Sequence, residues 1–281
     1  MNTIKNYISI ARPGHWFKNI FMLPGLVIAF LVAWSPVHTL IVPLIIGFIS
    51  TCAIASANYV INEWLDAEFD KFHPLKKNRP SVLGHIEFKY VIVEYIALAI
   101  FGLILAWFVS TLFFICSIWL LVMGVLYNVR PFRTKDKPYL DVLSESINNP
   151  IRLLLGWGIV TSVILPPSSL IIAYWMAGAF LMATKRFAEL RLITDRSTAV
   201  LYRKSFAYYT ENNLIISILF YGMSFAFFFA IFMIKYKIGL LLTLPLFAIM
   251  FAWYLHIGMI KDSPAQRPER LYEQKAYMFF V

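Results

Sequence analysis

Oxygen-bearing side chains recur at helical spacing between Asn62 and Asp70. On a helix, Asn62, Asp66 and Asp70 share one stripe, with Glu63 close beside it. Carboxylates that project together repel one another unless a cation binds them, and Mg²⁺ takes such hard oxygen ligands while it carries substrate phosphates. The spacing therefore predicts a Mg²⁺ site with Asn62, Asp66 and Asp70 as candidate ligands. The alternative is a polar helix end that contacts only water.

A basic stretch follows at once, over residues 71–80. Lysine and arginine side chains bind phosphate oxygens, arginine through a bidentate fork. Carboxylates beside cations predict a reaction in which a diphosphate leaves, because Mg²⁺ and the cations neutralise the charge that grows as a C–O bond breaks. His73 lies beside the acidic stripe, where it either donates a hydrogen bond to a phosphate or caps the loop.

Further polar residues follow a later apolar run. Tyr127 and Lys135 precede Asp141, and Arg152 lies within the next apolar segment at a spacing that favours the bundle interior. Ionisable groups within a membrane span are costly, so they are functional candidates by default. Packing contacts inside the bundle are the alternative. Lys18, in an aromatic and basic stretch, either anchors the first span or reaches the same cavity.

Another apolar run ends in Lys185, Arg186 and Glu189. These residues are the third group of polar side chains that could take part in chemistry. Lys185 and Glu189 lie four residues apart, so a simple ion pair along the helix is the alternative.

The elements that position these residues are predicted to be membrane helices. The 281 residues are 60% hydrophobic and only 14% charged, whereas soluble domains carry roughly a quarter charged residues. A span needs about 20 mostly apolar residues. We expect an all-α polytopic bundle, a single integral membrane domain over 1–281, with eight spans at 17–34, 39–62, 89–109, 111–129, 140–165, 168–190, 212–234 and 237–259. Residues 275–281 are interpreted as the start of a ninth helix, either truncated or lost.

The net charge of +10 follows this topology rather than indicating a nucleic-acid partner. With eight spans, the cationic loops fall on one side, which the positive-inside rule identifies as cytoplasmic. We expect a multi-pass protein of the inner (plasma) membrane, with its N-terminus and its active site on the cytoplasmic side. A cationic face suits anionic lipid or an anionic substrate.

The pattern resembles the UbiA superfamily of intramembrane prenyltransferases. Asn62, Asp66, Asp70 and the following Arg-Pro carry the resemblance, although Glu63 stands where that family usually has Asp. The usual second Asp-rich motif is replaced by Lys185-Arg186-Phe187-Ala188-Glu189. This replacement, with His73-Pro74-x-Lys76 and the Tyr127…Lys135…Asp141…Arg152 spacing, is similar to the decaprenyl-phosphate phosphoribosyltransferase branch.

That resemblance implies Mg²⁺-dependent transfer of a 5-phosphoribosyl group from phosphoribosyl diphosphate to a polyprenyl phosphate, a step in cell-wall or glycolipid precursor synthesis. It implies catalytic roles for Asp66, Asp70, Lys185 and Glu189. The substrate-binding residues would be Lys18, Asn62, Glu63, His73, Lys76, Lys77, Arg79, Tyr127, Lys135, Asp141, Arg152 and Arg186.

Two other functions stay open at this point. A UbiA-type enzyme would instead move a prenyl chain from prenyl diphosphate to an aromatic or other small acceptor. A lipid or anion transporter would bind a coupling ion at the acidic stripe, but transporters tend to place their sites near the midplane, whereas these polar groups cluster at one face.

Overall fold

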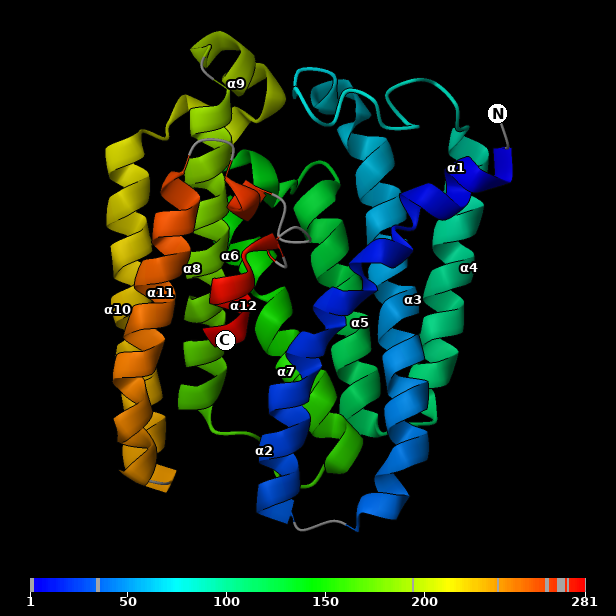
Figure 1. The fold of residues 1–281 in the computed structure, drawn as a ribbon. Helices are drawn as coiled ribbons and strands as arrows, with labels where there is room; N and C mark the ends of the chain where they lie inside the picture. The colour runs from blue at the N-terminus through cyan, green and yellow to red at the C-terminus, as the bar shows by residue number, and fades with distance from the viewer. Residues whose placement is uncertain are drawn as a thin grey trace. The chain divides into compact units, whose positions relative to one another are not determined.

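A computed structural model describes residues 3–33, 36–193, 195–236, 238–260, 263–266, 271 and 273–280. Every regular element in these ranges is a helix, which confirms the all-α prediction (Figure 1). The chain divides into two compact units, residues 1–135 with 148–166 and residues 136–147 with 167–281.

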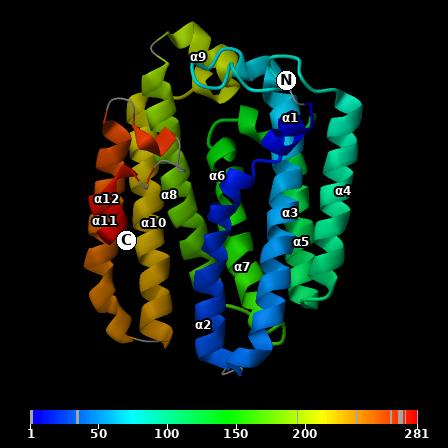
Figure 2. The same cartoon turned by 45° about the vertical axis from the view of Figure 1, so that its right-hand side comes forward.

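The first unit holds the N-terminal helices and one short later helix. Figure 2 shows α3 beside α4 and α5, and α2 beside α7. Its elements are α1 (Thr3–Ile10), the 3₁₀ helix η1 (Pro13–Met22), α2 (Leu23–Ala33), α3 (Val37–Asp70), α4 (Phe88–Trp107), α5 (Thr111–Asn128) and α7 (Asn148–Val160).

The second unit is built on α8, which packs against α6, α10 and α11. A short segment containing α9 and η3 follows the end of α8 and leads into α10. The elements are η2 (Thr134–Asp136, which begins in the first unit), α6 (Leu140–Ser146), α8 (Ser168–Leu192), α9 (Arg196–Tyr202), η3 (Lys204–Ala207), α10 (Glu211–Tyr236), η4 (Ile238–Thr243), α11 (Leu244–Met259), η5 (Pro264–Gln266) and α12 (Lys275–Phe280).

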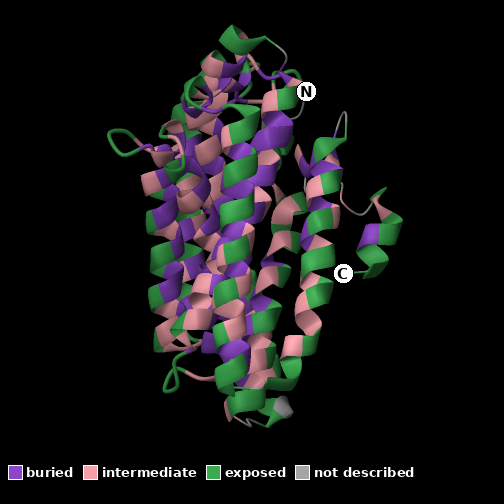
Figure 3. Cartoon of the chain, turned by 90° about the vertical axis from the view of Figure 1, so that its left-hand side faces the viewer, coloured by how far each residue is buried: buried purple, intermediate pink, exposed green. Residues whose placement is uncertain are grey.

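Seven helical segments among the described residues are long and apolar enough to cross a membrane. A helix satisfies its backbone hydrogen bonds internally, so it can expose apolar side chains to lipid. Figure 3 shows exposed residues along the helices, and many of these are large apolar side chains such as Phe101, Phe220 and Leu246. The seven segments are Ile4–Ala33, His38–Asp70, Phe88–Trp107, Thr111–Asn128, Ser168–Leu192, Glu211–Tyr236 and Ile238–Met259.

The predicted span over 140–165 is not a single helix. It divides into α6 and α7, which meet at Ile147, and irregular chain follows Val160. At ~1.5 Å per residue the 13 residues of α7 extend about 20 Å, less than the ~30 Å hydrocarbon core. Pro150 lies in the first turn of α7, which begins at Asn148. Proline is tolerated in a first turn, but it interrupts a helix that would continue through it from α6.

The predicted span over 39–62 continues as one helix to Asp70. The acidic stripe is therefore helical, as its four-residue spacing predicted. Asn62, Asp66 and Asp70 lie on the last turns of α3, where the chain leaves its apolar part.

Candidate functional site

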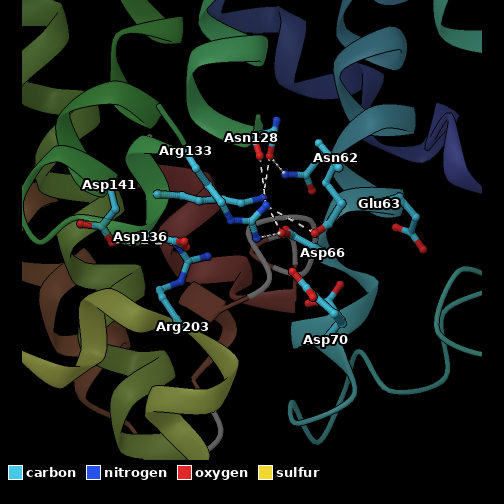
Figure 4. Close-up of polar contacts among 12 residues, drawn as sticks. Asn62, Glu63, Asp66, Asp70, Asn128, Arg133, Asp136, Asp141 and Arg203 are labelled. Atoms are coloured by element: carbon cyan, nitrogen blue, oxygen red, sulfur yellow. Dashed lines mark hydrogen bonds and ion pairs between the residues drawn. The ribbon is translucent and has the colours of Figure 1, made fainter. Parts of the chain in front are cut away.

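The carboxylates of α3 are each held by cations from other segments of the first unit. Asp66 Oδ1 accepts a hydrogen bond from Arg133 Nη2 at 3.0 Å and another from Lys135 Nζ. Asp70 Oδ2 accepts from Arg79 Nη1. Figure 4 shows Asp66 and Arg133 turned toward one another beside Asn128. The site is thus a cluster of carboxylates already matched by fixed cations.

Asn128, at the end of α5, connects the side-chain amide of Asn62 on α3 to Lys135, which lies in the basic segment after α5. Its Oδ1 accepts from Asn62 Nδ2 at 2.5 Å and from Lys135 Nζ at 2.7 Å, and its Nδ2 donates to the carbonyl of Gly124 at 2.9 Å. Lys135 is 3% exposed, and its ammonium also lies 5.6 Å from the ring centre of Tyr127. Asn128 therefore fixes both Asn62 and Lys135 beside Asp66.

Glu63 is buried and joins the N-terminal segment to the loop after α3. Its Oε2 accepts from Arg12 Nη2 and lies 3.7 Å from Arg79 Nε, and its Oε1 accepts from Ser81 Oγ at 3.2 Å. Because Arg79 also reaches Asp70, Glu63 orders the cation that holds the neighbouring carboxylate. These contacts occupy both Glu63 oxygens with protein groups.

An apolar cluster brings the N-terminal segment to α3. Ile10, Val60 and Val91 pack together, and Tyr7 Oη accepts a hydrogen bond from the backbone N–H of Glu87 at 3.0 Å. This packing positions Arg12 next to Glu63.

Two of the cations that touch the α3 carboxylates have left-handed backbone. Arg12 has φ 51° and Arg133 has φ 28°. Such conformations are unfavourable for residues with a Cβ and concentrate where the surrounding structure fixes a side chain for function. They support a functional interpretation of the Glu63 and Asp66 contacts.

The remaining predicted residues of the loop and of η1 have separate contacts. His73 is buried, and its Nδ1 accepts from the backbone N–H of Leu75 at 3.1 Å. Lys76 is half-buried and Lys77 is exposed. Lys18 Nζ lies 3.3 Å from His15 Nδ1.

Asp141, Arg186 and Glu189 meet in the second unit. Arg186 Nε donates to Asp141 Oδ2 at 3.1 Å, and its Nη1 donates to Glu189 Oε2 at 2.8 Å. All three side chains are at most 2% exposed. Lys185, by contrast, is half-buried. The KRFAE pattern therefore places Arg186 and Glu189 in an internal ionic network.

The segment after α8 completes this network. Tyr209 Oη donates to Asp141 Oδ1 at 2.6 Å, Ser205 Oγ donates to Asp141 Oδ2 at 3.2 Å, and Tyr202 Oη donates to Glu189 Oε1 at 3.4 Å. Burial first, and then the Asp141 carboxylate, raise the pKa of the Tyr209 phenol, which stays a hydrogen-bond donor.

Several of these contact residues were absent from the predicted site. Asn128 is a polar residue at the end of an apolar run, and Arg133 stands two places before Lys135, so both carried a recognisable signal. In sequence, Tyr209 fits either an interfacial anchor or a residue that contacts a ligand. Ser205 carried no signal, because serines of this kind are common in loops.

The donor set of α3 suits a divalent cation together with a phosphate ligand. Among the described residues, no three His, Cys, Asp or Glu side chains form a metal-binding cluster. Mg²⁺ is usually bound through one or two carboxylates, with substrate phosphates and water completing its shell, so such a cluster is not required. Asp66 and Asp70 supply two carboxylates one helical turn apart, and the Asp66 side chain is 16% exposed. The residues therefore fit Mg²⁺ bound with a polyphosphate.

Comparison with known proteins identifies the family of this chain. Residues 21–281 match the UbiA prenyltransferase family. Decaprenyl-phosphate phosphoribosyltransferase of Mycolicibacterium smegmatis is 28% identical, with 76% of this chain and 65% of that protein aligned. The protein of the same name from Corynebacterium glutamicum is 30% identical, with 76% and 62% aligned. The chain thus spans less than two thirds of the length of these two relatives.

Solved structures agree on the fold. A UbiA homologue from Archaeoglobus fulgidus, bound to DMAPP and Mg²⁺, superposes with a TM-score of 0.74 at 17% identity, covering 98% of this chain and 97% of that one.

Proposed function

Because the chain belongs to the UbiA prenyltransferase family, we propose that it is a multi-pass membrane enzyme that transfers a group from a diphosphate-bearing donor to an acceptor. The donor is phosphoribosyl diphosphate, the acceptor is a polyprenyl phosphate, and the site faces the cytoplasm of the inner membrane. The names of the relatives from M. smegmatis and C. glutamicum support this choice of substrates.

The observation that carries the proposal is the cation-matched carboxylate cluster at the end of α3. Asp66 is held by Arg133 and Lys135 and Asp70 by Arg79, so three cations contact these two carboxylates. A diphosphate brings negative charge that these cations bind while the carboxylates take up Mg²⁺. In this role Asn62 supports Asp66 through Asn128, and Glu63 holds Arg79.

The residues of the chain bind and orient the donor. Arg79, Lys135 and the loop lysines Lys76 and Lys77 contact the phosphate oxygens, and His73 of the same loop is buried. Charge-assisted hydrogen bonds of this kind are roughly twice as strong as neutral ones. Mg²⁺, when bound at Asp66 and Asp70, supplies further neutralisation of the leaving diphosphate.

The reaction requires little acid–base assistance. A phosphate oxygen of the polyprenyl phosphate forms a bond to C1 of the ribose, and the C1–O bond to the diphosphate breaks. The bonding electrons leave with the diphosphate, whose charge the cations stabilise. Because the acceptor is already an anion, no proton need be removed. Lys185 is the proposed second phosphate-binding cation.

Prenyl transfer is the second candidate. The A. fulgidus homologue with DMAPP and Mg²⁺ has the same fold over nearly the whole chain. In that reaction the protein would transfer a prenyl group from prenyl diphosphate to an aromatic or other small acceptor.

One experiment tests both candidates. Purified protein in detergent is incubated with Mg²⁺, phosphoribosyl diphosphate and polyprenyl phosphate, and the extracted lipid is analysed by mass spectrometry. A parallel incubation contains prenyl diphosphate and aromatic acceptors, and Asp70→Asn serves as the inactive control. We expect pentosyl lipid from the first incubation alone. Prenylated aromatic product without pentosyl lipid would instead establish the second candidate.

A further inference from the structure

Helix α1 carries an exposed apolar stripe beside a lysine. Ile4 and Ile8 lie one helical turn apart and are 71% and 57% exposed, and Lys5 lies exposed next to them. The opposite face of α1 is packed, because Ile10 is fully buried in an apolar cluster with residues of α3 and α4. A short helix that is apolar on its outer face and basic beside it is typical of one that lies in the plane of a membrane interface.

The length of the chain that follows places α1 outside the hydrocarbon core. The ten residues of η1 extend about 20 Å at ~2.0 Å per residue, and the 11 residues of α2 extend about 16 Å. Together these two elements are long enough to cross the ~30 Å core of a bilayer. Figure 1 shows α1 at an angle to α3 and α4, near the end at which α4 begins. Helix α1 is therefore positioned for the headgroup layer.

The first turn of α4 extends the exposed face of α1. The Tyr7 and Tyr90 rings lie 6.0 Å apart, edge to face, and Tyr7 Oη accepts a hydrogen bond from the backbone N–H of Glu87. Tyr90 is exposed, and so is Lys89, whose Nζ lies 5.9 Å from the centre of the Tyr90 ring. Aromatic and basic side chains at the end of a span anchor a protein at the interface. The α1 patch consists of Ile4, Lys5, Ile8, Lys89 and Tyr90.

The charge of the α1 patch favours anionic lipid. Residues 3–10 contain no acidic residue, and residues 87–90 contain only Glu87. Lys5 and Lys89 therefore outnumber the acid. Basic side chains close to an anionic leaflet strengthen membrane binding, and this contribution adds to that of the apolar stripe. The patch thus fits a leaflet that contains acidic headgroups.

Two residues after α1, the chain reaches the carboxylates of α3. Arg12 has φ 51° and ψ 57°, and Pro13 follows it. A left-handed residue before proline is unfavourable, so the packing on both sides must hold it. Arg12 Nη2 donates to Glu63 Oε2, and the guanidinium lies 5.5 Å from the centre of the Tyr59 ring. Because only Ala11 separates α1 from Arg12, the position of α1 sets the position of this guanidinium.

Arg12 in turn affects how Arg79 is shared. The buried Glu63 carboxylate contacts both Arg12 and Arg79, and Arg79 also contacts Asp70. Without Arg12, Glu63 would keep Arg79 and Ser81 among the contacts described above. A buried carboxylate that has lost one cation holds the other more tightly. An Arg79 that neutralises Glu63 then binds an incoming phosphate less well.

We propose that the α1 patch binds the headgroups of an anionic leaflet, and that this binding, through Arg12 and Glu63, strengthens diphosphate binding at the α3 carboxylates. The second half rests on the proposed function, which puts the diphosphate of the donor there. The two states are α1 docked on the lipid and α1 released from it. Because coupling between two sites is reciprocal, bound diphosphate must also favour the docked state.

Docking of α1 is measured without any substrate. Cys52 and Cys116 are buried, so an environment-sensitive dye on Ser9→Cys, an exposed position of α1, reports on this helix alone. The labelled protein is placed in vesicles of phosphatidylcholine, with or without phosphatidylglycerol, that carry spin-labelled headgroups as quenchers. We expect stronger quenching of the dye in the vesicles that contain phosphatidylglycerol.

Variants separate the α1 patch from general electrostatics. Ile4→Gln/Ile8→Gln should abolish the quenching in both kinds of vesicle, because the apolar anchor is lost. Lys5→Gln should lower the quenching in mixed vesicles toward that in phosphatidylcholine. Lys235→Gln, which removes an exposed lysine of the second unit, should leave it unchanged. All of these changes are at exposed side chains, so the Tm in detergent should stay near that of the wild type.

Coupling is measured as the affinity for radiolabelled inorganic diphosphate in the presence of Mg²⁺. In mixed vesicles the wild type should bind it about fivefold to tenfold more tightly than Ile4→Gln/Ile8→Gln. Both proteins are compared in the same vesicles, so repulsion between diphosphate and the lipid cancels. In an Arg12→Gln background the two isoleucine changes should have no further effect, because the link to Glu63 is already broken. Saturating diphosphate should increase the quenching of the dye on the wild type.

Other outcomes would overturn the proposal. Equal quenching of the wild type in both kinds of vesicle would remove the preference for anionic lipid, and shielding of the dye that depended on protein concentration would mean that a second copy covers the patch. Equal diphosphate affinity of the wild type and Ile4→Gln/Ile8→Gln would disconnect α1 from the α3 carboxylates. If the expected results held but the wild type formed no pentosyl lipid, the proposed function would fail and this inference would stand.

Discussion

Replacing Arg186 by Gln should strongly destabilise the second unit. The change keeps a polar side chain but removes the charge shared by Asp141 and Glu189, which are 0% and 1% exposed. Glu189 would keep only Tyr202, at 3.4 Å, among the contacts described above. Asp141 would keep Tyr209 and Ser205 as donors, with Arg203 Nη1 at 3.9 Å from its Oδ2. Both buried carboxylates would lose the guanidinium that contacts them at 3.1 and 2.8 Å.

The expected magnitude follows from that burial. Removing one partner of a buried ion pair costs about 3–5 kcal/mol, because the remaining charge stays desolvated. In a chain of this size, ~1 kcal/mol shifts the Tm by about 2–4 °C, so the Tm should fall by roughly 6–20 °C. Such a loss is a large fraction of typical protein stability.

Lys204→Gln is the matched control in the same unit. Lys204 Nζ lies 4.0 Å from Asp136 Oδ2, and the lysine side chain is 56% exposed. Exposed pairs contribute about 0–1 kcal/mol, so this variant should unfold near the wild-type temperature. Arg186→Lys, which retains the charge, should lose less stability than Arg186→Gln.

Thermal unfolding in a single detergent, followed by circular dichroism, distinguishes these outcomes. If Arg186→Gln unfolded within about 1 kcal/mol of Lys204→Gln, the buried network would not stabilise the fold. Arg186 would then be assigned to the substrates rather than to the protein.

Four further predictions concern chemistry, topology and pH. Asp66→Asn should abolish nearly all pentosyl-lipid formation while the protein stays folded, with a lower Tm because the buried Arg133 and Lys135 lose a carboxylate partner; wild-type turnover in excess chelator would refute the Mg²⁺ site. Lys185→Ala should reduce kcat/KM about tenfold to a hundredfold, since one charge-assisted phosphate contact is lost; an unchanged value would remove Lys185 from the site. A cysteine label at Asn78 should react with impermeant reagents only from the cytoplasm, and a label at Pro166 only from outside. Labelling of either position from both sides would contradict a site on a single membrane face. Because burial and Asp141 raise the Tyr209 pKa above its ordinary ~10, wild-type stability should decline as pH rises above about 10, and Tyr209→Phe should show a shallower decline between pH 9 and 11.

The membrane helices and the acidic stripe could be predicted from local sequence. Long apolar runs must form helices in a bilayer, because only helices satisfy their own backbone there, and the spacing of Asn62, Asp66 and Asp70 places them on one helical stripe. The prediction of a single helix over 140–165 was wrong, because the apolar content of a segment does not show where a helix is interrupted. In the structure α6 ends at Ser146, and α7 begins at Asn148.

Which charges neutralise one another was decided by the tertiary structure alone. In sequence, Arg152 and Arg186 both lie within apolar helices, and Glu189, three residues after Arg186, is the local acidic residue that distinguishes them. The fold brings Asp141, far along the chain, onto Arg186, and it brings the side-chain amide of Asn19 onto Arg152, which also donates to the carbonyl of Asn148. Electrostatic energy depends on the distance between groups in space and on their burial, neither of which spacing along the chain contains. The sequence by itself therefore determined which residues are charged and which helices carry them, and the tertiary packing decided which of those charges are matched.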